Sequence, residues 1–137
     1  MMNAKTVAID FDGVLHSYQG GWQGYEVISG EAVPGVIEDI KRLKAAGYRV
    51  VVMTSRALMY EGKKAAAEWM RARGLTVGCG LEGDEDSDVF DVTYRKVPAL
   101  VYIDDRGVTF RPGMDLVETV EKFTPWMNEK PIESAFE

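Results

Sequence analysis

The 137-residue sequence predicts an α/β fold in which helices flank a central parallel sheet. Short apolar runs at residues 5–9, 48–53 and 99–103 have the composition of buried strands. Amphipathic stretches of about 12 residues separate such runs, a spacing typical of strand–helix–strand units with right-handed crossovers. Polar residues directly follow each apolar run, as they do where parallel strands end at a ligand-binding edge.

The first half contains two strands, a flap and a helix. Residues from about 14 to 33 are rich in Gly, Tyr and Trp and lack helical periodicity, so we expect a short β-hairpin or an irregular flap there. Pro34 and Gly35 then open a helix that ends at Gly47, and the strand over 48–53 follows directly.

The second half alternates in the same way. In chain order we expect a helix over 60–73, a strand over 75–79, an acidic loop over 82–91, a buried strand over 99–103, a small strand over 107–110, a closing amphipathic helix over 115–127 and a loosely held tail over 128–137.

Composition limits the function. The length fits a single domain over 1–137, and the net charge of −6 without a basic run argues against stable nucleic-acid binding. Cys79 is the one cysteine and His16 the one histidine, so neither a disulfide framework nor a zinc site is expected. With no leader-like or membrane-spanning stretch, we expect a cytoplasmic protein.

The most informative segment is Asp10-Phe11-Asp12-Gly13, which ends the first apolar run. Side chains two residues apart on a strand share a face, so the two carboxylates point to one place. Carboxylates brought together repel unless a cation lies between them, and oxygen ligands favour a hard ion such as Mg²⁺. The alternative is a strand followed by an ordinary Asp-Gly turn.

Four motifs in order resemble those of the haloacid dehalogenase superfamily of phosphohydrolases, over residues 5–111. They are the D-x-D-G-V run beginning at Asp10, an apolar strand ending in Thr54 and Ser55, Lys96 upstream of the last strand, and the acidic pair Asp104-Asp105 that ends it. The resemblance implies a three-layer Rossmann-like fold.

The resemblance also implies roles for these residues. Asp10 would attack phosphorus to form an aspartyl-phosphate, and Asp12 would act as general acid and then general base, unless it only supports the metal site. Mg²⁺ would be held by Asp10, the backbone carbonyl of Asp12 and an acid of the last motif. Asp104 is our choice for that acid, with Asp105 as its alternative.

The contacts to phosphate stay open. Thr54 or its neighbour Ser55 would hydrogen-bond a phosphoryl oxygen, although a hydroxyl at a strand end also caps helices. Lys96 would neutralise the phosphoryl charge, with Arg95 as its rival and a solvated surface lysine as the alternative reading. Gly13 allows the backbone to turn sharply beside the substrate.

Further side chains near these motifs have two readings each. His16 could touch the substrate or make a structural hydrogen bond in the flap. Arg56 could grip a second anionic group or pair with acids of the 82–91 loop. Trp22 and Tyr25 could stack on a ring or pack within the flap. The acidic loop itself lacks the spacing of a calcium-binding loop.

The expected function is Mg²⁺-dependent hydrolysis of a phosphomonoester, either a small molecule or a macromolecular end. No gap between motifs can house a cap domain, so the site is expected to be open unless a second subunit covers it. A short Ile-Asp-Asp-Arg segment ending at Arg106 is similar to the phosphatase domain of polynucleotide kinases, which makes a nucleotide-end phosphatase one alternative. A catalytically weak binding module on the same fold is the other.

Overall fold

The computed structural model describes residues 5–18 and 20–126, and it has a Rossmann-like α/β fold. Four strands form one all-parallel sheet in the order β3-β2-β1-β4. The strands are β1 (Lys5–Asp10), β2 (Tyr48–Met53), β3 (Asp91–Thr93) and β4 (Val101–Ile103). The predicted parallel sheet is therefore confirmed.

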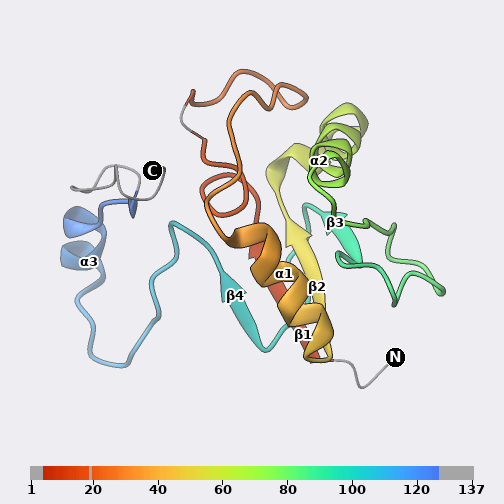
Figure 1. The fold of residues 1–137 in the computed structure, drawn as a ribbon. Helices are drawn as coiled ribbons and strands as arrows, with labels where there is room; N and C mark the ends of the chain where they lie inside the picture. The colour runs from red at the N-terminus through yellow and green to blue at the C-terminus, as the bar shows by residue number, and fades with distance from the viewer. Residues whose placement is uncertain (1–4, 19, 127–137) are drawn as a thin grey trace.

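Three helices and one 3₁₀ turn accompany the sheet: α1 (Val36–Ala45), η1 (Ser55–Leu58), α2 (Tyr60–Ala72) and α3 (Leu116–Lys122). Figure 1 shows α1 lying over one face of the sheet along β2, while α2 packs against η1 and β3. The described chain contains no separately folded cap, as predicted. None of the described helices combines the length and apolarity needed to cross a bilayer.

The core lies around the two central strands. Buried apolar side chains from β1 and β2 meet Ile40 of α1 and a cluster on α2 that includes Trp69 and Met70. Phe11 and Leu15, which directly follow β1, are fully buried in the same core. The turn after β1 is thus fixed by apolar packing, which holds the neighbouring acids at the sheet edge.

The strand order places a topological switch point beside β1. The chain leaves β1 to form β2 on one side, and β4 later pairs on the other side, with Val7 opposite Val101 and Ile9 opposite Ile103. In open α/β sheets, ligands bind in the crevice at the carboxyl ends of the strands that flank such a point. Here these are the ends of β1 and β4.

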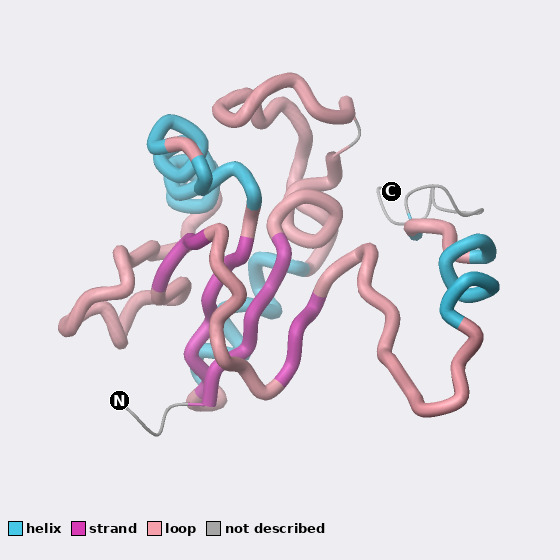
Figure 2. Tube along the Cα trace, turned by 180° about the vertical axis from the view of Figure 1, so that it is seen from behind, coloured by secondary structure: helices cyan, strands magenta, loops and turns pink. Residues whose placement is uncertain are grey.

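The last strand and helix differ from the prediction. β4 is shorter than 99–103 and is not buried, since its three side chains are 40–47% exposed. It lies at the edge of the sheet, and α3 stands apart from the sheet in both Figure 1 and Figure 2. The helix itself ends at Lys122 instead of 127, because Pro125 follows closely and disfavours helix before it.

Two predicted strands are wrong and one was missed. Residues 75–79 form only a single bridge between Val77 and Val89, and 107–110 form no strand. The sheet is completed instead by β3 at the end of the acidic loop, where Val92 is buried. The polar residues on either side of Val92 hid this short strand. The predicted tail over 128–137 lies outside the described residues.

The predicted flap over 14–33 is irregular, not a hairpin with a strand ladder. Within its described residues, one antiparallel bridge joins His16 to Ala32, and loops form the rest. Backbone hydrogen bonds run from Ser17 to Glu31 and from Val33 to Leu15 at its base. Side chains, described below, hold the remainder in place.

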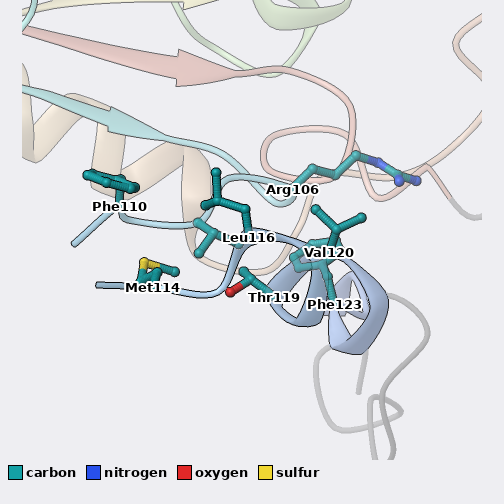
Figure 3. Close-up of a pocket in the computed structure, with 8 residues that line it drawn as sticks. Arg106, Phe110, Met114, Leu116, Thr119, Val120 and Phe123 are labelled. Atoms are coloured by element: carbon teal, nitrogen blue, oxygen red, sulfur yellow. The ribbon is translucent and has the colours of Figure 1, made fainter. Parts of the chain in front are cut away.

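The C-terminal segment encloses an apolar hollow of its own, of about 390 Å³. Figure 3 shows its lining side chains, which come from α3 and from the segment before it, including Phe110, Met114 and Leu116. None of the predicted site residues lines this hollow. This hollow is therefore distinct from the predicted site.

Candidate active site at the carboxyl edge of the sheet

Three carboxylates meet at the switch point. One oxygen each from Asp10, Asp104 and Asp105 lies within 4.8 Å of the others. Asp10 ends β1, and the two other acids directly follow β4, which pairs with β1 in register. The sheet thus brings together residues more than 90 positions apart, as the sequence pattern predicted.

The cluster shifts the titration of Asp10. The pKa of its carboxyl is raised from 3.8 to about 7, first by burial and then by a side-chain hydrogen bond with Asp105, while the Phe11 amide opposes both. The charges of Asp105 and Asp104 act in the same direction as burial. The three acids therefore cannot all ionise easily without a cation.

Gly13 makes this close approach possible. It adopts a left-handed backbone conformation with φ of +90°, and a Cβ atom there would overlap Oδ2 of Asp105. Only glycine meets both conditions without strain. The glycine of the D-x-D-G run therefore gives Asp105 room to stand beside Asp10.

Asp12 has a different environment from Asp10. Arg56 donates from Nε to Oδ2 at 2.9 Å and from Nη2 to Oδ1 at 3.1 Å, forming a two-point ion pair. His16 contacts Oδ1 through Nδ1 at 2.8 Å. Burial alone would raise the pKa of Asp12, but the bonds from His16 and Arg56 outweigh it and lower that pKa. The pKa values of the two acids of the motif are thus shifted in opposite directions.

The histidine is held in one tautomer. The Gly30 amide donates to Nε2 at 2.8 Å, so this nitrogen is the acceptor and Nδ1 carries the proton toward Asp12. His16 is only 2% exposed, and a Cβ on Gly30 would lie 2.5 Å from its Nε2. Of the two alternatives given for His16, contact with substrate or a structural hydrogen bond in the flap, this placement agrees with the second.

Arg56 connects Asp12 to the flap. Its guanidinium is completely buried, and Nη1 donates to the carbonyls of Gly24, Tyr25 and Val27. It pairs with Asp12 and makes no ion pair with the acids of the 82–91 loop, all of which are described, so that alternative for Arg56 is wrong. Because every branch of the guanidinium has a partner, the flap and Asp12 are held as one unit.

The aromatic side chains of the flap contact one another and Arg56. The rings of Trp22 and Tyr25 meet edge to face at 5.1 Å, and Trp22 lies 4.9 Å from the Arg56 guanidinium. These contacts match the packing alternative given for this pair.

Thr54 and Ser55 follow β2 beside the motif. Thr54 is buried, and its Oγ1 accepts a hydrogen bond from the Arg56 amide at 3.2 Å, which caps the 3₁₀ turn η1. Ser55 is exposed. Thr54 therefore has the capping role weighed above, and either hydroxyl remains a candidate contact to phosphate.

Lys96 is not brought into the carboxylate cluster. Its ammonium lies 4.9 Å from the centre of the Tyr102 ring, and among the described residues it forms no ion pair. Arg95 likewise lies over an aromatic ring, that of Tyr94. Both cations precede β4 in an exposed segment. A role for either at the phosphoryl group requires its side chain to turn toward the acids.

A hollow of about 280 Å³ opens beside the acids. Its lining includes the acids Asp104 and Asp105, Gly13, an apolar group of Val14, Val33 and Pro34, and Trp126. The indole Nε1 of Trp126 donates to the Gly13 carbonyl at 2.7 Å. No periodicity or motif in the sequence points to this tryptophan, which joins the site only through tertiary folding.

The residues present fit a hard divalent cation. The donors are carboxylate oxygens, which Mg²⁺ prefers. Burial and, to a smaller extent, the charges of Asp105 and Asp104 raise the pKa of Asp10, and a bound cation would oppose both effects. The described group consists of carboxylates, without a sulfur or imidazole donor. Asp10, Asp104 and Asp105 could therefore hold the ion.

No protein-family model and no curated protein matches the chain. A solved structure of a conserved protein from Bacteroides thetaiotaomicron is similar, with 30% sequence identity and a TM-score of 0.54. The match covers 89% of this chain and 94% of that one. Its description names no activity. At this identity and coverage, the chain belongs to the same family as this conserved Bacteroides protein.

Proposed function

We propose that the protein is a Mg²⁺-dependent phosphomonoester hydrolase that acts through an aspartyl-phosphate. The observation that carries this proposal is the meeting of Asp10, Asp104 and Asp105 at the switch point, directly beside the D-x-D-G turn. The likeness of the four motifs to haloacid dehalogenase-type phosphohydrolases supports the same reading.

Three carboxylates and, by the family resemblance, one backbone carbonyl would serve the metal ion. Asp10, the Asp12 carbonyl and Asp104 would hold Mg²⁺, with Asp105 as the alternative or additional acid. When bound, Mg²⁺ would neutralise the acids and draw charge from the phosphoryl oxygens. It would also keep Asp10 ionised, because the attraction of a nearby cation opposes the burial that raises its pKa.

The reaction divides into two displacements. A carboxylate oxygen of Asp10 attacks phosphorus, and the bond between phosphorus and the alcohol oxygen breaks. Water then attacks the same phosphorus, and the bond to Asp10 breaks to release inorganic phosphate. Asp12 gives a proton to the departing alcohol in the first step and takes one from water in the second.

The environment of Asp12 favours its second role. With Arg56 and His16 bound, its carboxylate is ionised and ready to accept a proton from water. To donate a proton first, it has to take one up when the substrate binds, against the ion pair with Arg56. Departure of a poor leaving group is therefore the demanding step.

The other predicted residues complete the proposal. Thr54 or Ser55 would donate to a phosphoryl oxygen, and Lys96 would approach it by turning away from Tyr102. The Gly13 turn would let the phosphoryl group come close to the backbone. His16 and Arg56 would act on the substrate only through Asp12, because both are buried.

The test measures phosphate release from p-nitrophenyl phosphate by the full chain with Mg²⁺, with excess EDTA, and by the variant Asp10→Asn. We expect turnover only in the first case. Binding of beryllofluoride with Mg²⁺ to the normal protein, and not to Asp10→Asn, would identify the phosphorylated residue. Normal turnover by Asp10→Asn, or in EDTA, would disprove the proposal.

One observation favours a second candidate, a phosphate- or metal-binding module with little turnover. Both oxygens of Asp12 are engaged, and Lys96 stands apart from the acids. Such a module would bind Mg²⁺ and beryllofluoride but release no phosphate from aryl or alkyl esters. The same measurements therefore separate the two candidates.

A further inference from the structure

The hollow beside the acids has features that select among phosphomonoesters. Its lining combines three acidic side chains, those of Asp39, Asp104 and Asp105, with apolar walls and an indole ring. Its described lining residues include no lysine, arginine or histidine, so a second anionic group on the substrate would find no cation among them. Asp39 is paired with Arg42, and Asp104 and Asp105 would be neutralised by the metal ion, so the hollow suits an alcohol portion that carries no further charge of either sign.

Its size points the same way. About 280 Å³ lies at the lower end of ligand sites, for which roughly 300 Å³ and more is usual. A single ring fits such a space, whereas an extended polar chain would project beyond it into solvent. The open side of the hollow allows the ester to reach the carboxylates from solvent.

Trp126 supplies a flat surface at a fixed place. Its Nε1 donates at 2.7 Å to the carbonyl of Gly13, three residues beyond Asp10, which holds the indole beside the acids. The side chain is half-buried and is among those that line the hollow. Val14 and Pro34 offer apolar contact nearby.

From these observations we propose that Trp126 determines specificity by contacting a planar, uncharged ring in the alcohol portion of the substrate. This inference rests on the proposed phosphomonoester hydrolysis and adds the class of ester. In a site without a cap, this contact would provide binding energy away from the phosphoryl group and so orient it for attack by Asp10.

The experiment compares benzyl phosphate with cyclohexylmethyl phosphate, two alkyl esters of similar size that differ in the planarity of the ring. We expect the normal protein to have a higher kcat/KM for the benzyl ester, mainly through KM. Trp126→Leu should reduce this preference about three- to tenfold, the range of an aromatic pair contact. Tyr60→Leu, which removes an exposed ring from the start of α2, is the matched control and should leave the preference unchanged.

Trp126→Phe separates the ring from the hydrogen bond. It keeps an aromatic face but loses the N–H that binds Gly13, so we expect it to retain most of the preference for benzyl phosphate. If Phe and Leu lose the preference equally, the tryptophan acts only by tethering the C-terminal segment, and the inference is overturned. It is equally overturned if Leu keeps the normal preference.

Binding of non-hydrolysable benzylphosphonate with Mg²⁺, measured by calorimetry, separates this inference from the proposed function. Ring-dependent binding that Trp126→Leu weakens, without turnover of either ester, supports the tryptophan site and disproves hydrolysis. Turnover with no dependence on Trp126 supports hydrolysis and disproves the tryptophan site. If neither turnover nor binding occurs, both proposals fail.

Discussion

At the scale of single residues, the pKa values of the two acids of the D-x-D-G run are shifted in opposite directions. Burial and Asp105 raise the pKa of Asp10 to about 7, while the bonds from His16 and Arg56 lower that of Asp12. Two carboxyl groups with separated pKa values can take separate roles in one reaction. The alternation of residues on a strand does not reveal this difference, because it depends on Arg56, which lies 44 positions further along the chain.

The raised pKa of Asp10 makes the metal-free protein sensitive to pH. The folded state releases this proton near pH 7, and the unfolded chain releases it near pH 3.8. The contribution of Asp10 to the free energy of unfolding therefore falls as the pH rises from 3.8 to 7 and is constant above pH 7. Each pKa unit corresponds to about 1.4 kcal/mol, and the loss is a few kcal/mol. In EDTA, Asp10→Asn should therefore raise the Tm at pH 8 by more than at pH 5.

Thermal unfolding at the two pH values measures this difference. Asp86→Asn is a control, since that carboxylate lies exposed in the acidic loop. It should change the Tm equally at both pH values. An Asp10→Asn protein with no extra gain at pH 8 would mean that burial and the neighbouring acids do not disfavour the ionised form of Asp10.

Asp12 gives a prediction about leaving groups. p-Nitrophenolate departs without a proton, whereas an alkyl alcohol requires one, so loss of a general acid harms alkyl esters more. Asp12→Asn should lower kcat/KM for benzyl phosphate by about 10²- to 10⁴-fold and that for p-nitrophenyl phosphate by less. Equal losses with both esters, measured by phosphate release, would indicate that Asp12 supports the site but transfers no proton in the first step.

Gly13 can be tested against a glycine with the same backbone conformation. Gly13→Ala would drive a Cβ into the carboxylate of Asp105 and displace this acid, whereas Gly113 has a φ of +92° and open space within 4 Å of the position that a Cβ would take. Both alanine variants should lose about 1–3 kcal/mol of stability through their backbone conformation. Only Gly13→Ala should also weaken Mg²⁺ binding, measured by calorimetry, and equal Mg²⁺ affinity in both variants would contradict this role of Asp105.

At the scale of elements, Arg56 determines the form of the flap. Its guanidinium donates hydrogen bonds to Asp12 and to three carbonyls of the flap. The described residues of the flap form no strand ladder of their own. A loop of this length is usually fixed by turns or by its own side chains, and here a guanidinium from a distant 3₁₀ turn does so. The flap is therefore part of the site, and its conformation depends on the hydrogen bonds of Arg56.

Arg56→Lys should be strongly destabilising, because lysine cannot reproduce the two-point pair with Asp12 and three carbonyl contacts at once. Breaking a buried ion pair costs about 3–5 kcal/mol. Arg42→Lys is the matched control, since its pair with Asp39 is exposed and contributes about 0–1 kcal/mol. Denaturant unfolding measures both losses, and limited proteolysis should cleave the 14–33 flap faster only in Arg56→Lys.

The regular elements were predictable from the sequence where apolar periodicity was strong. The strands β1 and β2 and the helices α1 and α2 lie within a few residues of their expected bounds, because each buries an apolar face in the core. β3 and the C-terminal end of α3 could not be predicted from apolar periodicity. β3 has three residues and one buried side chain, so its order comes from pairing with β2, a contact that no local pattern encodes.

The residues of the candidate site likewise fall into those whose positions the sequence pattern could predict and those whose positions it could not. Asp10, Asp104 and Asp105 were predictable because strand ends in a parallel sheet share one edge. Arg56, His16 and Trp126 owe their places to hydrogen bonds across long stretches of chain, and the last of these spans 113 positions. Such contacts follow from the folded geometry and leave no periodic signal in the sequence.

At the scale of the whole molecule, the acids join the two sides of the switch point. β4 is an edge strand, exposed on its surface and paired with β1 alone among the described strands, whereas β2 is buried and paired on both sides. Parallel strands are normally covered on both faces, so β4 is the least protected strand of this sheet. A cation shared by Asp10 and the acids after β4 would connect this strand to the centre of the fold.

Mg²⁺ should therefore protect β4, although this strand opens locally. In hydrogen exchange of the metal-free protein, amides of Val101–Ile103 should exchange by local opening, faster than those of Val50–Val52. Opening of β4 separates the metal ligands, so Mg²⁺ at 100 times its Kd should slow exchange in β4 by about 100-fold. Amides of β2 that exchange through global unfolding should be slowed by the same factor, whereas surface amides of α2, whose local opening leaves the metal ligands together, should not be slowed.

Asp104→Asn combined with Asp105→Asn provides the control for this experiment. The double variant keeps the strand and its pairing but removes two of the three acids, so Mg²⁺ should no longer slow exchange in β4. Protection that persists in the double variant would place the ion elsewhere. Protection in the normal protein that is confined to the 14–33 flap, with β4 unchanged, would show that the acids after β4 do not bind the metal, and would leave Asp10 and the flap as its only contacts.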